Sequence, residues 1–302
     1  MRRKTSLFAQ IAVIVSSLAL SGVPVPAQNT PDSQDRATVL RTNSKISYHD
    51  GPVRTGVQHI YFIFYGCWHS GCNLNDDNVP APFILADFAS TIGNTSYLQM
   101  NSSYTDSAGS PASAAIVYAG TAFDSSYSHG GDLTVADIQG IIADQFLSFS
   151  LPQDPQGIYV VAASADIASQ ETRFCTPGAP PFHGSAVING GLHTYVFLGG
   201  PTRCPTAAAP QFVGQPTPNN NFTGDAMVTN LAHALNGLLT NPYGSGWFDR
   251  YGLENADKCA GTFGQTYTTP NGARANIHLN IRDFLLEQNW VNARKAFCGM
   301  SQ

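Results

Sequence analysis

Three short apolar segments set the strongest limit on how this chain can fold. Residues 58–65 are mostly β-branched and aromatic, which is typical of a strand. Residues 157–163 and 194–198 are near-continuous apolar runs, a pattern that suits strands covered on both faces. A chain of 302 residues is long enough to bury such strands in a sizeable core.

Predicted helices alternate with these strands. Apolar residues recur at helical spacing in residues 82–91, 132–148 and 225–239. This alternation predicts an α/β fold, a mixed β-sheet flanked by helices, followed by a loop-rich C-terminal half pinned by disulfides. The remaining predicted elements are a strand at 114–119, a long loop at 199–224 and a last short helix near 281–286.

The N-terminus has the pattern of an export signal. Arg2, Arg3 and Lys4 precede an apolar stretch at 7–20, and a small residue, Ala27, follows. The stretch is shorter than the roughly 20 residues that span a bilayer, which argues against the alternative of an uncleaved anchor. We therefore predict three parts: a signal peptide (1–27), a flexible leader (28–45) and a single domain (46–302).

Charge and export limit the partners of the mature chain. Removal of three basic residues leaves 12 Lys+Arg (15 − 3) against 20 Asp+Glu, a net charge of −8. An acidic chain is a poor match for nucleic acid or anionic membranes. We expect a secreted protein, or a periplasmic one in a Gram-negative host, without membrane insertion after signal cleavage.

The cysteine count fits an oxidising compartment. Six cysteines are an even number, which in an exported chain implies disulfides. Fifteen pairings are allowed, and proximity along the chain favours Cys67–Cys72, Cys175–Cys204 and Cys259–Cys298. The rival interpretation, a zinc cluster, lacks a Cys-x-x-Cys pair.

A series of sequence blocks resembles the EXORDIUM / phosphate-induced protein 1 family. Four of these blocks show the resemblance most directly, and they come in the family's order. They are the opening Tyr-His-x-Gly-Pro, a strand ending Phe-Tyr-Gly, Phe-Cys followed by His-Gly-Ser, and a helix that ends at Thr-Asn-Pro. One block departs from the pattern, because Ala260 stands where the family has Pro. The blocks lie at 48–53, 64–66, 174–185, 195–205, 224–242, 259–264 and 282–298.

The resemblance implies an extracellular role, which in plant relatives concerns growth and cell expansion. It supplies no biochemical activity. The segment from Cys67 to Asn78 looks like an insertion, and the signal peptide and polar leader are those of a microbial member.

The helix at 225–239 holds the sharpest chemical hint. Some microbial relatives carry His-Glu-x-x-Glu there, as metallopeptidases do. A zincin needs two ligands one turn apart and a Glu beside the first as general base. This chain keeps His233, but Ala234 replaces the base and Gly237 the second ligand. We therefore expect a degenerate metallopeptidase-like helix, with His233 as the one candidate metal ligand or a hydrogen-bonded structural residue.

Other residues offer weaker hints. His183 is predicted in a Pro/Gly-rich loop after Cys175, where loops often carry function. His69, inside the Cys67–Cys72 loop, could contact a metal or simply be exposed. The run from Asn73 to Asn78 has the alternating oxygen side chains of calcium loops but lacks the Gly and distal Glu of an EF-hand.

Three functions remain open. The leading one is a secreted, non-enzymatic EXORDIUM-like protein that acts in the extracellular space or at the cell wall, with polysaccharide or extracellular protein as partner and no cofactor. The second is a divergent zinc metallopeptidase-like hydrolase with ligands among His183, His193 and His233. The third is a carbohydrate-binding module that uses aromatic rings in its loops. These rings belong to Trp68, Tyr243, Trp247, Phe248 and Trp290.

Overall fold

The computed structural model describes residues 44–72 and 80–302. The predicted signal peptide, nearly all of the predicted leader and the candidate calcium run from Asn73 to Asn78 lie outside these ranges. Among the described residues, no helix combines the length and apolar character needed to cross a bilayer.

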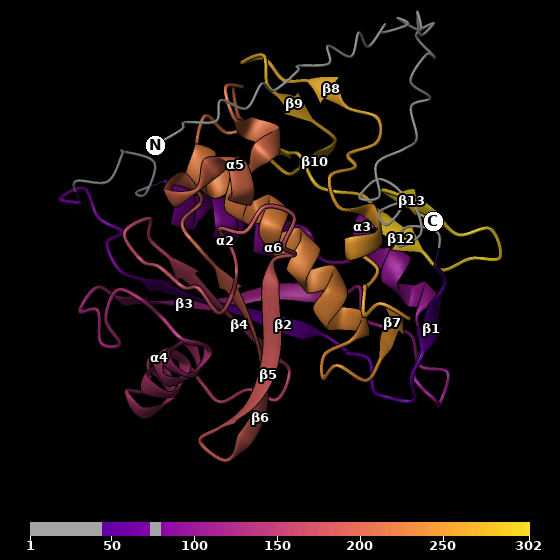
Figure 1. The fold of residues 1–302 in the computed structure, drawn as a ribbon, viewed down its shortest axis with the longest axis horizontal. Helices are drawn as coiled ribbons and strands as arrows, with labels where there is room; N and C mark the ends of the chain where they lie inside the picture. The colour runs from indigo at the N-terminus through magenta and orange to yellow at the C-terminus, as the bar shows by residue number, and fades with distance from the viewer. Residues whose placement is uncertain (1–43, 73–79) are drawn as a thin grey trace, which may run out of the picture.

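A five-stranded mixed sheet forms the centre of the described chain, in the order β3-β2-β4-β6-β5 (Figure 1). Strands β3, β2, β4 and β6 run parallel, and β5 pairs antiparallel with β6. The predicted mixed sheet is confirmed. The strands are β2 (Gln58–Tyr65), β3 (Ile116–Asp124), β4 (Gly157–Ala163), β5 (Phe182–Ile188) and β6 (Gly191–Leu198).

Helices cover both faces of this sheet, as the apolar strands require. Helices α2 (Ala81–Thr91) and α6 (Phe222–Thr240) pack on one face, and α4 (Val135–Leu147) packs on the other (Figure 1). Successive side chains of β2 point to opposite faces, so that Phe62 packs with α2 and α6 while Ile63 packs with α4. Burial of each large apolar side chain contributes about 1.5–3 kcal/mol.

Side chains at the helix starts explain where α4 and α6 begin. The Thr134 hydroxyl accepts a hydrogen bond from the Asp137 amide, and the Asp137 carboxylate accepts one from the Thr134 amide, which completes a capping box. The Asn221 side chain caps α6 by accepting from the Gly224 amide. Asn241 follows the helix, where the next residue is proline, as predicted.

The C-terminal segment, residues 241–302, consists mainly of small hairpins and turns. Its hairpins are β8 (Tyr267–Thr268) with β9 (Arg274–Ala275), β10 (Ile277–Leu279) with β11 (Arg282–Phe284), and β12 (Asn289–Val291) with β13 (Phe297–Gly299). Its first strand, β7 (Trp247–Asp249), instead pairs with β1 (Ile46–Tyr48) from the start of the described chain. Single helical turns connect larger elements. These are α3 (Ser96–Gln99), η2 (Met100–Ser103), η3 (Pro201–Arg203), α5 (Pro205–Ala208), η4 (Pro210–Phe212) and η5 (Asp257–Cys259).

The predicted helix near 281–286 is wrong, because this segment forms strand β11. Asn280 turns the chain with a φ of 54°, and Arg282–Phe284 then pairs antiparallel with β10. The Asn276 side chain fixes the chain after β11. It accepts a hydrogen bond from the Leu286 amide and donates one to the Leu286 carbonyl. Six residues are too few for periodicity to separate a helix from a strand.

All six cysteines are paired, in the pairs that proximity along the chain favoured. The paired residues are 5, 29 and 39 positions apart. Cys259–Cys298 joins η5 to β13 and so closes the C-terminal segment on itself.

Loop length predicts how much each disulfide stabilises the fold. Replacing Cys259 and Cys298 by Ser should lower the free energy of unfolding by about 4 kcal/mol, and replacing Cys67 and Cys72 by about 2 kcal/mol, because a longer closed loop restricts the unfolded chain more. Urea unfolding of the two double variants measures both losses. A larger loss for the Cys67–Cys72 pair would contradict this order.

Candidate functional site

His233 lies in the middle of α6 between two carboxylates. Its side chain is 5% exposed, its Nδ1 lies 2.7 Å from Glu287 Oε2, and its Nε2 lies 3.0 Å from Asp257 Oδ1. Carboxylates accept hydrogen bonds, so both ring nitrogens donate and the ring is an imidazolium. In this arrangement His233 has no lone pair left for a metal ion.

The charges of this cluster stabilise one another. Burial alone lowers the pKa of His233, but the hydrogen bonds and charges of Asp257 and Glu287 outweigh it and raise the pKa to about 10. Burial raises the pKa of Asp257, yet the imidazolium beside it holds that pKa below the usual value. One cation between two anions leaves the cluster with a net charge of about −1.

The carboxylates of Asp257 and Glu287 both belong to the C-terminal segment. Asp257 opens the turn η5, which the Cys259–Cys298 disulfide ties to β13. The other oxygen of Glu287, Oε1, accepts from the Gly261 amide at 2.6 Å. The Glu287 carbonyl accepts from the Tyr97 hydroxyl at 2.9 Å.

His183 belongs to strand β5, which corrects the prediction that placed it in a functional loop. The Pro/Gly-rich composition ends at Pro181, and pairing with β6 makes the next seven residues a strand. His183 Nε2 lies 2.7 Å from Glu254 Oε2, and Asn241 donates to the other oxygen of Glu254 at 2.6 Å. Burial lowers the pKa of His183, but Glu254 outweighs it and raises that pKa above its ordinary value.

Gly237 explains how this second pair fits beside the helix. A Cβ on Gly237 would lie 2.1 Å from Glu254 Oε2 and 2.9 Å from His183 Nε2. The pair therefore occupies the space that a side chain at this position needs. The position one turn after His233 thus holds a hydrogen-bonded His–Glu pair instead of a metal ligand of the helix itself.

The structure does not bring the three candidate histidines together. His193, on β6, packs against Phe146 of α4 and Tyr159 of β4, on the sheet face opposite α6. Burial lowers the pKa of its ring, and neither ring nitrogen has a hydrogen-bond partner among the described residues. Only His183 and His233 lie on the α6 side.

A pocket of about 570 Å³ opens beside the His233 cluster. Phenyl rings from four segments line it together with small and aliphatic residues, and polar groups come from η4, α6 and the C-terminal segment. Of the described residues that line it, none is lysine or arginine. The rings are Phe174, Phe182, Phe197 and Phe263, and the polar residues are Gln211, Thr229, Asn230, His233, Asp257 and Glu287.

Four of the five aromatic residues that the sequence singled out for sugar stacking have partners within the fold. Trp68 is 6% exposed and donates to the Tyr65 carbonyl. Trp247 donates to the Thr105 carbonyl, Phe248 stacks on His49, and Trp290 lies under the Lys258 ammonium. The phenyl rings that line the pocket are further candidates for contact with a sugar.

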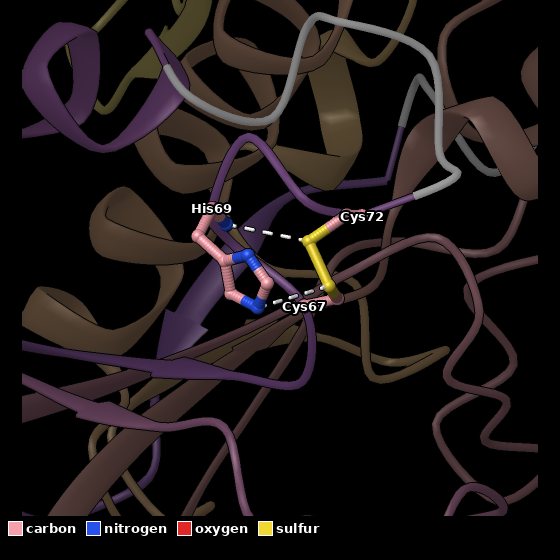
Figure 2. Close-up of side chains that lie close together, drawn as sticks. All are labelled: Cys67, His69 and Cys72. Atoms are coloured by element: carbon pink, nitrogen blue, oxygen red, sulfur yellow. Dashed lines mark hydrogen bonds between the residues drawn. A yellow bond between two sulfur atoms is a disulfide. The ribbon is translucent and has the colours of Figure 1, made fainter.

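His69 lies against the Cys67–Cys72 disulfide (Figure 2). One ligand atom each from Cys67, His69 and Cys72 lies within 4.8 Å of the other two, a closeness that no other group of three His, Cys or acidic residues reaches in the ranges 44–72 and 80–302. The two sulfurs are bonded to each other in this state and are not thiolates.

Reasoning from the sequence missed Asp257, Glu287 and Glu254. Each is a single acidic residue outside any regular pattern, and only the path of the C-terminal segment brings them to α6. The available signals were that Glu287 lies inside the family-like block 282–298 and that Asp257 comes two residues before the block that starts at Cys259.

The pH dependence of stability should report the His233 cluster. A pKa raised from about 6.5 in the unfolded chain to about 10 in the fold means that the stabilisation is complete below pH 6.5 and is lost as the pH rises through 10. His233→Gln should lower the free energy of unfolding by about 3 kcal/mol at pH 6, because it leaves two half-buried carboxylates without their cation.

Urea unfolding at pH 6, 8 and 10 checks this expectation. The difference between wild type and His233→Gln should shrink towards pH 10, where the wild-type imidazolium also loses its proton. His278→Ala is the matched control, since that side chain is 60% exposed and bonds Asp283 outside the cluster. A difference that stays constant across this range would contradict the charged imidazolium.

Gly237→Ala should destabilise the protein although alanine is the better helix former. The gain in helix propensity is about 1 kcal/mol, whereas displacement of the buried Glu254 carboxylate should cost more and leave a net loss of about 1–3 kcal/mol. Gly131→Ala is the control, because a Cβ there meets nothing within 4 Å. Thermal unfolding of both variants provides the measurement, and a stabilised Gly237→Ala would refute the fit.

Comparison with known proteins identifies relatives of the chain. The model of the phosphate-induced protein 1 conserved region matches residues 46–277. The chain is 30% identical over 290 residues to Protein EXORDIUM-like 5 of Arabidopsis thaliana, an alignment that covers 84% of this chain and 77% of that protein.

Two further relatives agree. Protein EXORDIUM-like 3 of Arabidopsis thaliana is 27% identical, with 82% of this chain and 80% of the relative covered. Protein PHOSPHATE-INDUCED 1 of Nicotiana tabacum is 26% identical, with 73% and 74% covered. No solved structure matches the chain.

Proposed function

Because the chain belongs to the EXORDIUM / phosphate-induced protein 1 family, we propose that it is a secreted protein that acts by binding rather than by hydrolysis, in the extracellular space or at a cell wall. The observation that carries this proposal is the state of His233. Both of its nitrogens donate to carboxylates, so the residue that a zinc peptidase would use as a ligand serves to hold the C-terminal segment on α6.

The neighbours of His233 support the same conclusion. Ala234 has no group that can take a proton from water, and Gly237 has no ligand atom. Zinc binding by His233 would require loss of an imidazole proton and of a hydrogen bond to a buried carboxylate. Three disulfides are also typical of a chain that works in an oxidising compartment.

The pocket beside His233 is our candidate for the binding site. Its volume lies in the range of ligand sites, about 300–1,000 Å³. Phenyl rings can pack on the apolar faces of sugars, and the carboxamides of Gln211 and Asn230 can bond hydroxyl groups. The negative cluster and the lack of basic lining residues favour uncharged segments of polysaccharide over anionic ones.

Retention on insoluble polysaccharide tests the binding site. The oxidised chain without its signal peptide should bind a neutral wall polysaccharide, and Phe263→Ala should weaken binding roughly 2- to 10-fold through loss of one ring contact. Phe149→Ala is the matched control, because that ring is 93% exposed and does not line the pocket. Equal weakening by both variants, or no retention at all, would overturn the proposed site.

The same preparation tests the hydrolytic alternative. We expect no zinc-dependent cleavage of peptides and no zinc retained after dialysis without chelator. About one zinc per oxidised chain, lost in His233→Ala and accompanied by peptide cleavage, would instead establish the metallopeptidase hypothesis.

A further inference from the structure

The Cys67–Cys72 loop lies at the topological switch point of the sheet. From β2 the chain passes through α2 to β3 on one side, and from β3 it passes through α4 to β4 on the other side of β2. Sheets of this type bind ligands outside the carboxyl ends of the strands at the switch point. Cys67 comes two residues after the end of β2, and its amide donates to Ser164 Oγ, just after β4.

The loop places three ligands for a borderline-soft metal side by side, two cysteine sulfurs and one imidazole (Figure 2). His69 Nε2 lies 3.6 Å from Cys67 Sγ. A tetrahedral zinc with Zn–S of about 2.3 Å and Zn–N of about 2.05 Å holds its sulfur and nitrogen ligands roughly 3.6 Å apart. The imidazole therefore already stands at the distance that coordination requires.

The bond between the two sulfurs prevents both cysteines from binding a metal ion as thiolates. A dithiol reductant removes it: one thiolate of the reductant attacks a sulfur, the mixed disulfide resolves, and the products are two protein thiols and one oxidised dithiol. A divalent metal then binds Cys67 and Cys72 as thiolates and releases two protons. Coordination through Nε2 moves the ring proton of His69 to Nδ1, which breaks the bond that Nδ1 now accepts from the Gly71 amide.

The fold can tolerate the opening of this disulfide. Its cysteines are five positions apart, against 29 and 39 for the other two, so it restricts the unfolded chain least. The loop is also open to solvent, since His69 is exposed and both cysteines are partly exposed.

We propose that the Cys67–Cys72 loop is a redox-gated metal site. As a disulfide it binds no metal. After reduction by a dithiol, Cys67, His69 and Cys72 bind one zinc ion and leave its fourth position open to water or an exogenous ligand. The site is distinct from the His233 cluster and does not rest on the function proposed above.

Zinc binding before and after mild reduction tests this site. The mature chain is titrated with a dithiol until thiol labelling and mass spectrometry show that Cys67–Cys72 alone is open. Equilibrium dialysis with zinc should then give about one ion per reduced chain and none per oxidised chain. Cobalt in place of zinc should show a thiolate-to-metal charge-transfer band in the reduced protein only.

Variants separate the site from adventitious binding. His69→Ala should weaken zinc binding at least about tenfold, since removal of a ligand costs no less than removal of a supporting residue, and Cys67→Ser with Cys72→Ser should abolish it. His278→Ala should leave it unchanged, since that side chain is 60% exposed and bonds Asp283. Zinc bound equally by the oxidised chain, unaltered affinity in His69→Ala, or no zinc after selective opening of this disulfide would each overturn the proposal.

Discussion

One imidazolium between two carboxylates joins the central helix to the C-terminal segment. Helix α6 is buried along almost its whole length, so a charged side chain in its middle is tolerated only with partners at hydrogen-bond distance. Asp257 and Glu287 supply them from two separate turns of the C-terminal segment. This segment consists of short hairpins with little core of their own, and its position against the sheet depends on this contact, on the Cys259–Cys298 disulfide and on apolar residues such as Phe284 and Leu286.

The same contact shapes the chemistry of the site. A metallopeptidase helix offers an imidazole nitrogen to zinc and a carboxylate to water. Here the carboxylates come from outside the helix and bind the imidazole itself, while Gly237 makes room for the His183–Glu254 pair. The result is a closed set of hydrogen bonds next to an open, mildly negative pocket, an arrangement better suited to holding a ligand than to activating water.

The topology of the sheet marks a second candidate site, at its switch point. Strands β2 and β4 diverge in their connections at the switch point, and the loop that follows β2 carries a short disulfide with a histidine beside it. This loop and the pocket beside His233 differ in chemistry. The pocket has phenyl walls and fixed hydrogen bonds, whereas the loop has sulfur ligands whose availability depends on redox state.

The sequence by itself determined the layers of the fold and the kinship of the chain. Continuous apolar runs such as 157–163 require cover on both faces, and an even cysteine count with short spacings favoured the pairs that are found. The loss of a base at Ala234 and of a ligand at Gly237 could also be read directly, because those side chains lack the atoms.

Only the tertiary structure decided what the remaining residues do. The segment 182–188 is a strand because β6 offers it an edge, and 282–284 is a strand because β10 pairs with it, contacts that local sequence does not encode. The charge state of His233 depends on Asp257 and Glu287, which lie 24 and 54 positions away along the chain. Burial brings them together, and in that desolvated setting the proximity of opposite charges, not the identity of the histidine, sets its role.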